Sequence, residues 1–223
     1  MFNFFKKKKI SNKKIDKIYD QHLYTGLNGI LMRYCHRNLE KTLPNKEFKK
    51  VLEIGAGSEP HYKYIKEKNC KYFILELKGG KKLLDKRFKY KFYDGNKIPF
   101  KDSEFDRIIL SHTLEHIVFP EFFLKQVLRK VKKGGVVSIS LPTDPAVMWR
   151  IGRLFNKIFK IKKTLNTNAL EYDYMNSIEH INSFFNLHSI IRYNFQKKIK
   201  ESFLPFNINF PDINLFYNVH LIK

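Results

Sequence analysis

Apolar residues in this 223-residue chain gather in short runs separated by lysine-rich stretches. Short apolar runs bounded by turn residues are typical of buried strands. Strands are expected at 51–54, 71–77, the start of 92–117, 105–110, 136–141 and 213–223. Helical patterns lie between and around these runs, so the chain is predicted to be an α/β protein. We expect a Rossmann-like, mostly parallel sheet with helices on both faces and an antiparallel closing strand.

Three stretches space their apolar residues as helices do: 12–43, 120–133 and 146–163. Gly26 and Gly29 could divide the first of them into two helices. The third has apolar residues along one face and arginine and lysine on the other, so it either lies on an anionic membrane or covers the sheet. Residues 171–195 are rich in Tyr, Asp, His and Asn and lack helical apolar order.

The segment VLEIGAGSEP (51–60) joins the first strand to a glycine-containing loop. Gly55 and Gly57 allow a sharp turn and a close approach of a ligand to the backbone. Ser58 suits a helix N-cap and Pro60 suits a first helical turn, which predicts a helix directly after the loop. Strand, glycine loop and helix together form the nucleotide-binding unit of a doubly wound fold. A purely structural turn is the alternative.

Two features of this loop argue against a dinucleotide. The dinucleotide fingerprint requires a third glycine where Pro60 stands. Glu59 would repel a pyrophosphate at the helix N-terminus, and Glu53 adds negative charge before the loop. A ligand with positive charge and no phosphate fits better, and S-adenosylmethionine is such a ligand.

Further motifs follow in a fixed order. Glu76 ends the second strand about twenty residues past the glycines, where an acid can accept hydrogen bonds from ribose hydroxyls. Asp94 and Gly95 follow the third strand, and the segments PFKDSEFD and SHTLEHI enclose the fourth. Together these motifs resemble the class I S-adenosylmethionine-dependent methyltransferases over residues 48–142, closest to the small-molecule branch that includes quinone methyltransferases. The segments TDPAVMWRIGR and EHINSFFNLHSIIRY resemble methyltransferases found with bacterial surface-polysaccharide biosynthesis.

The resemblance implies a role for each matching residue. The methionine part of the cofactor would lie on Glu53, Gly55, Ala56 and Gly57, the ribose on Glu76, the adenine on Asp94 and Gly95, and the sulfonium near Ser111 and His112. Glu59 departs from the family pattern, which often has a third small residue at that position. The chain would divide into an N-terminal helical lid (1–45), a cofactor-binding core (46–142), and acceptor-side helices and closing strands (143–223).

The acceptor side is expected to hold the substrate and a base. Trp149 projects from the polar side of its helix, where core packing does not explain it. The predicted acceptor-binding residues are Trp149, Tyr172, Asp173, Tyr174, Glu179 and His180. His112, His116 and His180 are candidate bases, because imidazole titrates near neutral pH. Residues Tyr19, His22 and Tyr24 of the lid would either touch the cofactor or pack in the core.

A competing motif, H-x-x-E-H, is formed by His112, Glu115 and His116. Zinc ligation by this motif requires a helix that places both histidines on one face. Here the motif follows directly on a strand, and no cluster of Cys or His accompanies it. We therefore expect no metal.

The composition indicates which kinds of binding partner to expect. The net charge is +22, mostly from lysine, alongside abundant Asn, Ile, Phe and Tyr. AT-rich codon usage gives such a mixture without selection for charge, so we do not expect a nucleic-acid partner. The positive charge favours an anionic partner such as a membrane surface. The two cysteines, Cys35 and Cys70, form no framework, and MFNFFKKKK does not resemble a secretory signal. The expected location is the cytoplasm or its membrane surface.

The predicted function is methyl transfer from S-adenosyl-L-methionine to a small molecule or glycan precursor, at oxygen or nitrogen. Two alternatives stay open: a methyltransferase acting on RNA or protein, and a non-catalytic protein that binds the cofactor.

Overall fold

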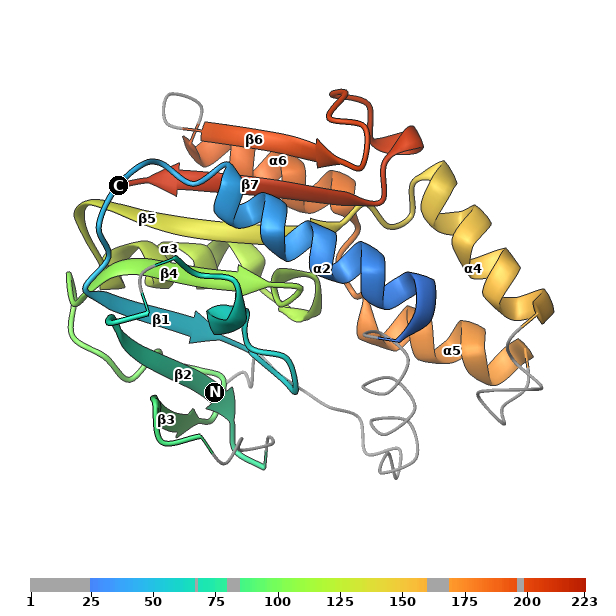
Figure 1. Ribbon diagram of the computed structural model, residues 1–223. Helices are drawn as coiled ribbons and strands as arrows, with labels where there is room; N and C mark the ends of the chain where they lie inside the picture. The colour runs from blue at the N-terminus through green and yellow to red at the C-terminus, as the bar shows by residue number, and fades with distance from the viewer. Residues whose placement is uncertain (1–24, 67, 80–84, 160–168, 196–198) are drawn as a thin grey trace.

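The computed structural model describes residues 25–66, 68–79, 85–159, 169–195 and 199–223. The described residues form a seven-stranded sheet of order β3-β2-β1-β4-β5-β7-β6 (Figure 1). Its strands are β1 (Lys50–Ile54), β2 (Lys71–Leu77), β3 (Phe88–Tyr93), β4 (Phe105–Ser111), β5 (Val131–Pro142), β6 (Ile199–Leu204) and β7 (Phe216–Ile222). Strands β1 to β5 are parallel, and β7 runs antiparallel to both β5 and β6. This arrangement confirms the predicted fold class.

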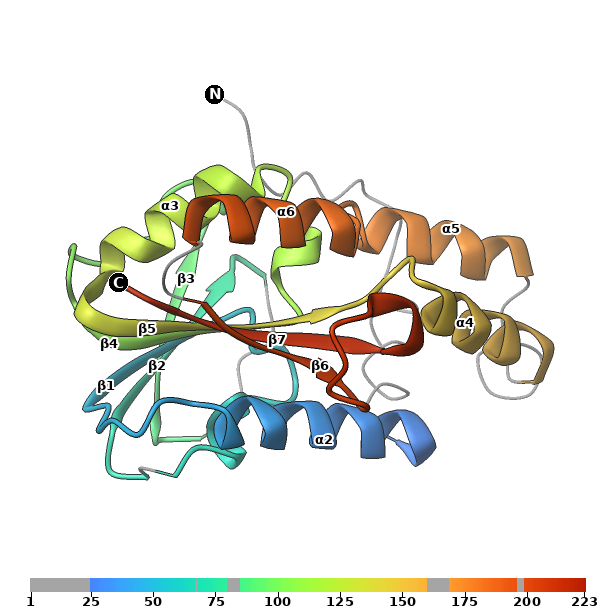
Figure 2. The ribbon, with the colours of Figure 1, turned by 90° about the horizontal axis from the view of Figure 1, so that it is seen from above.

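Helices cover both faces of the sheet. The described helices are α2 (Gly26–Lys41), α3 (Pro120–Lys130), α4 (Val147–Phe159), α5 (Ala169–Glu179) and α6 (Phe184–Phe195), with 3-10 turns η1 (His61–Lys63), η2 (Leu114–His116) and η4 (Pro211–Ile213). Helix α2 lies on one face, and α3 and α6 lie on the other (Figure 2). Helices α4 and α5 extend beyond the carboxyl end of β5 (Figure 1).

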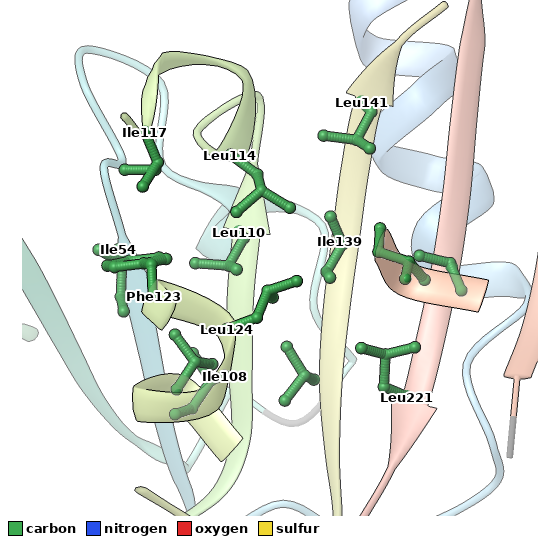
Figure 3. Close-up of a cluster of buried hydrophobic side chains, with 14 of the residues drawn as sticks. Ile54, Ile108, Leu110, Leu114, Ile117, Phe123, Leu124, Ile139, Leu141 and Leu221 are labelled. Atoms are coloured by element: carbon green, nitrogen blue, oxygen red, sulfur yellow. The ribbon is translucent and has the colours of Figure 1, made fainter. Parts of the chain in front are cut away.

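The main core fills the space between the sheet and the layer of α3 and α6. Apolar side chains of the sheet meet those of α3 and the η2 segment there (Figure 3). Leu110, Leu114 and Ile139 are fully buried. Each side chain of this size contributes about 1.5–3 kcal/mol by leaving water. This packing fixes the end of β4 and the SHTLEHI segment that follows it.

A second core lies under α2. Leu39 of this helix packs with Val51 of β1 and Ile109 of β4, and all three are buried. The described part of the predicted lid is therefore attached to the sheet. Tyr19, His22 and Tyr24 lie outside the described residues, so their expected contacts with the cofactor stay predictions.

The prediction of a helix directly after the glycine loop is wrong: the described residues there form no α-helix. The chain forms one 3-10 turn, η1, whose N-cap position is Pro60 and not Ser58. The side chain of Glu59 instead pairs with Lys63. Tyr62 of this turn packs edge to face against Tyr72 of β2. A short turn filled by aromatic packing replaces the helix and removes the helix N-terminus at which a pyrophosphate would bind.

Helix α4 is oriented opposite to the expectation that it covers the sheet. Its apolar residues Val147, Ile151, Leu154, Phe155 and Ile158 are 40–64% exposed. The side with Trp149 and Arg153 faces the protein instead, where Arg153 pairs with Asp144. The periodicity identified the two faces correctly, but it does not state which of them the fold buries.

The chain after β5 contains more regular structure than its pattern predicts. Residues 171–195 were expected to lack helical apolar order, but they form most of α5 and all of α6, and α6 buries Phe184, Leu187 and Ile191 at helical spacing. The strand β6 was not predicted, because its sequence IKESFL reads as mixed polar and apolar. Strand β5 begins at Val131, ahead of Gly134 and Gly135, so α3 ends earlier than predicted.

Candidate functional site

The carboxyl ends of four neighbouring parallel strands bring the predicted cofactor residues to one edge of the sheet. The glycine loop follows β1, Glu76 lies near the end of β2, Asp94 follows β3 and Ser111 ends β4. The Gly57 amide donates a hydrogen bond to Glu76 Oε1 at 2.9 Å. Asp94 is exposed and its Oδ1 accepts the amide of Asn96 at 3.0 Å. In open parallel sheets, ligands bind at this edge.

The two loop glycines have different surroundings. Both adopt positive φ, +75° at Gly55 and +57° at Gly57. A Cβ atom at Gly55 would lie 2.9 Å from Thr113 Oγ1, and the Thr113 hydroxyl donates to the Ile54 carbonyl. A Cβ atom at Gly57 would meet nothing within 4 Å, so open space lies over the loop where a ligand can approach. Thr113 is a residue that the sequence did not single out, since its contact with the loop depends on the pairing of β1 and β4.

Glu53 lies beneath the loop rather than in the open space above it. It is 1% exposed, both its oxygens accept the His61 amide at 3.0 Å, and Oε2 also accepts the Tyr72 hydroxyl at 2.7 Å. Burial raises the pKa of Glu53 to about 7, although these two donors act in the opposite direction. Its carboxylate holds the turn after the loop in place, and its contact with the methionine part of the cofactor stays a prediction.

A buried polar network connects this turn to α2. His61 Nε2 lies 2.7 Å from Glu40 Oε1, which also pairs with Arg107 Nη1 at 2.6 Å, and His36 Nδ1 lies 2.7 Å from His61 Nδ1. Burial opposes ionisation of Glu40, but His61 and Arg107 lower its pKa to about 2. The charges are therefore paired within the network, which ties α2 to the turn below the cofactor edge.

His112 follows the last residue of β4 in a left-handed conformation, with φ +52°. Its amide donates to the Ser140 carbonyl at 3.0 Å, and its Nδ1 lies 3.7 Å from Glu115 Oε1. Burial alone would lower the pKa of His112, but Cys35 and Glu115 raise it to about 9. His112 is thus held beside Glu115, and its role as a base stays a prediction.

Next to His112, five side chains from different elements form what we call the acceptor cluster: Glu115, His116, Asp144, Trp149 and His180. His180 Nδ1 lies 2.7 Å from Asp144 Oδ2, and His116 Nδ1 lies 2.5 Å from the Glu179 carbonyl. The His116 and His180 rings are 5.4 Å apart, and the Trp149 ring is 6.2 Å from that of His180. Three predicted residues, His116, Trp149 and His180, thus lie together.

Several buried polar atoms of the acceptor cluster lack a hydrogen-bond partner among the described residues. They are both carboxylate oxygens of Glu115, Oδ1 of Asp144 and Nε1 of Trp149. Glu115 is 2% exposed, and His112 and His116 lower its pKa although burial acts in the opposite direction. A buried group without a partner costs about 1–3 kcal/mol, and more when it is charged. Such groups are expected where a polar ligand binds.

Other predicted acceptor residues lie apart from this cluster. Asp173 pairs with Lys157 at 2.5 Å on the exposed side of α5, and Tyr174 is 45% exposed. Tyr172 is half-buried on the same helix. Trp149 is in the cluster for a different reason than predicted: its ring packs on Phe216, 5.9 Å away, so core packing does account for its position. Asp144 and Phe216 were not singled out, and no local pattern indicates them.

The zinc motif does not form the helical arrangement that it requires. Leu114–His116 is a 3-10 turn and His112 precedes it in a left-handed conformation. One ligand atom from each of Glu115, His116 and His180 lies within 4.8 Å of the others, and this group omits His112. The absence of a metal stays a prediction.

The sheet order, the glycine loop and the acid at the end of β2 agree with an S-adenosylmethionine-dependent methyltransferase. The methyltransferase-domain family matches residues 27–196, and the chain belongs to this family. These residues form a methyltransferase domain, and S-adenosyl-L-methionine is its cofactor. The open space above Gly57 and the acid at Glu76 fit that cofactor.

Several known proteins are similar. A demethylmenaquinone methyltransferase of Clavibacter sepedonicus is 32% identical over 138 residues, which cover 57% of this chain and 56% of the relative. The mitochondrial ubiquinone biosynthesis O-methyltransferase of Homo sapiens is 24% identical, over 59% of this chain and 41% of the relative. The chain thus matches about half the length of these relatives.

Solved structures share the fold. A methyltransferase of Thermotoga maritima, described as a possible histamine N-methyltransferase, has a TM-score of 0.60 at 18% identity, covering 95% of this chain and 99% of the other. The plantazolicin methyltransferase in complex with a substrate analogue and S-adenosylhomocysteine has a TM-score of 0.65 at 13% identity, covering 96% and 91%.

Proposed function

We propose that this enzyme transfers a methyl group to a small molecule or glycan precursor, at an oxygen or nitrogen atom. The acceptor cluster carries the proposal. It lies beside His112, which follows β4, and Thr113, which contacts the cofactor loop, so an acceptor bound there would be next to the cofactor edge. Two of the relatives bear the names of quinone methyltransferases, which supports a small acceptor.

The chain would use its residues in two groups. Gly55, Ala56 and Gly57 would hold the methionine part of the cofactor, Glu76 the ribose, and Asp94 and Gly95 the adenine, while Ser111 and His112 lie at the inner end. S-adenosylmethionine supplies an electrophilic methyl group on its sulfonium. On the acceptor side, Trp149, Glu179 and His180 would orient the acceptor, with His116 or His180 as the base.

The test is the location of the methyl group. The enzyme is incubated with S-adenosylmethionine labelled in the methyl group and with extract of its native host, separated into nucleotide sugars, other small molecules including lipids, RNA and protein. We expect label in a small-molecule or nucleotide-sugar fraction, and a glycan precursor would place it in the latter. Label confined to RNA or protein would contradict the proposal and favour the alternative acceptors.

We also propose that α4 contacts an anionic membrane surface. Among the described residues, no helix is long and apolar enough to cross a bilayer. The exposed apolar face of α4 and the lysine-rich composition instead fit binding at the lipid–water interface. Leu154→Glu should weaken sedimentation with phosphatidylglycerol vesicles, whereas Tyr193→Glu on α6, where the side chain is 80% exposed, should not. The proposal would be contradicted if both variants and the native protein sedimented equally. It would also be contradicted if the native protein bound neither phosphatidylglycerol vesicles nor control vesicles of phosphatidylcholine.

A further inference from the structure

Glu115 is the most unusual group of the acceptor cluster. It is a buried carboxylate whose two oxygens accept no hydrogen bond from the described residues. The Nδ1 atom of His112 is 3.7 Å from Oε1, beyond hydrogen-bonding distance. An ionised carboxylate without donors is among the most costly groups to bury. A bound molecule that supplies a donor would remove this cost.

Beside Glu115, the pair of His180 and Asp144 has the geometry of an oriented base. Asp144 Oδ2 lies 2.7 Å from His180 Nδ1, and Arg153 pairs with the same carboxylate. The side chains of His180 and Asp144 are 8% and 7% exposed. A carboxylate that binds Nδ1–H fixes the imidazole tautomer and leaves the Nε2 lone pair to take a proton. Arg153 keeps Asp144 in place from α4.

From this arrangement we propose that the acceptor carries a hydroxyl group, that Glu115 and Trp149 bind it, and that His180, positioned by Asp144, takes its proton. The inference rests on the proposed methyl transfer and narrows its acceptor. The proton of the reacting hydroxyl points to His180, so Glu115 would accept a hydrogen bond from a second donor group of the acceptor. Trp149 Nε1–H, which has no acceptor among the described residues, would donate to the reacting oxygen. An ammonium group has no lone pair for this donor, whereas a hydroxyl group can both donate and accept.

The chemical step balances without a further reactant. The hydroxyl oxygen forms a bond to the methyl carbon as the carbon–sulfur bond breaks, and the pair of electrons in that bond stays on sulfur. The hydroxyl proton moves to Nε2 of His180, and Asp144 stabilises the resulting imidazolium. The proton is then released to water, which restores His180 for the next turnover.

The first test concerns Asp144 as a positioning residue and needs no acceptor. Histidine labelled with nitrogen-15 reports the tautomer of neutral His180 by NMR. We expect Nδ1–H in the native protein and a loss of this preference in Asp144→Asn, because the asparagine amide can donate to Nδ1. Glu201→Gln is the matched control, since Glu201 faces another histidine, His188, at 3.9 Å. An unchanged tautomer of His180 in Asp144→Asn would overturn the positioning role.

The second test concerns Glu115. In Glu115→Gln, methyl transfer from labelled S-adenosylmethionine to native-host small-molecule extract should fall at least tenfold, while calorimetric affinity for S-adenosylmethionine stays within about twofold. Glu115→Asp, which keeps the charge, should recover part of the rate and covers the case that the glutamine variant does not fold. Unchanged methyl transfer by Glu115→Gln would overturn the proposal. So would the finding that the purified native protein holds one divalent metal ion per chain, because the cluster would then be a metal site. If the native enzyme labels no small molecule, the proposed function fails, and the NMR result still decides the role of Asp144.

Discussion

The cofactor edge and the acceptor cluster lie side by side at the carboxyl end of the sheet, but they satisfy their polar atoms differently. At the cofactor edge, Glu53 accepts from His61 and Tyr72, and Glu76 accepts from Gly57. In the acceptor cluster, Glu115 and Trp149 have buried polar atoms without partners among the described residues. The cofactor edge is formed by backbone turns that its own carboxylates support, although Ser111 Oγ at the end of β4 also lacks a partner among the described residues. The acceptor cluster has a buried carboxylate with neither oxygen partnered, and it depends on a ligand to complete its hydrogen bonds.

This difference indicates how substitutions should separate the two regions. Changes at the cofactor edge should alter affinity for S-adenosylmethionine, and changes in the acceptor cluster should alter the rate of methyl transfer with little effect on that affinity.

The largest effect is expected at Gly57. Gly57→Val would place a branched side chain in the open space above the loop at a positive φ, so calorimetric binding of S-adenosylmethionine should be lost while the fold survives. Gly134→Val is a matched control, because Gly134 also has positive φ but lies near the amino end of β5, away from the carboxyl ends of the strands where the cofactor would bind. Native affinity in Gly57→Val would refute the assignment of the loop.

His180 should dominate the acceptor side. His180→Ala should slow methyl transfer at least tenfold, and up to the ~10²–10⁴ typical of a lost general base, with cofactor affinity within about twofold. His188→Ala on α6 serves as the control, since His188 is half-buried and lies outside the cluster. Unfolding of His180→Ala, or native turnover, would assign His180 to the core or the surface, and the base would have to be sought at His116.

Glu53, which lies below the loop, should make the free energy of unfolding depend on pH. Its pKa is raised from 4.5 to about 7, so its protonated form contributes stability that is fully present below about pH 4.5 and is lost as the pH rises through 7. Relative to the native protein, Glu53→Gln should therefore gain about 2–3 kcal/mol between pH 5 and pH 8.5 in the free energy of unfolding, measured with urea. A constant difference between the two proteins across this range would show that Glu53 is not perturbed.

The smallest effects should come from the acids at the ends of β2 and β3. Glu76→Ala should weaken binding of S-adenosylmethionine by about 1–3 kcal/mol, through the loss of a hydrogen-bond acceptor. Asp94→Ala should weaken it less, because Asp94 is exposed. Asp102→Ala, on an exposed acid that pairs with Arg129 and Lys130, should leave affinity unchanged. Tight binding of NAD would contradict the cofactor argument from Glu59 and Pro60.

The same contrast explains what the sequence could predict. Local patterns gave the strands β1, β2 and β4, the glycine loop and the acid Glu76, because each depends on residues close together in the chain. The orientation of α4 could not be predicted, since periodicity defines two faces without saying which one is buried. Likewise the pairing of Asp144 with His180 and of Thr113 with Gly55 depends on elements that meet only in the folded sheet.

The acceptor chemistry is tested most directly by the atom that receives the methyl group. The enzyme is incubated with S-adenosylmethionine carrying a carbon-13 methyl group and with small-molecule extract of its native host, and the product is examined by carbon-13 NMR. The account predicts that the labelled methyl resonance is that of a methoxy group, and that its initial rate of appearance falls at least tenfold with Glu115→Gln. A methyl group on nitrogen or carbon, or an undiminished methoxy signal in Glu115→Gln, would contradict it.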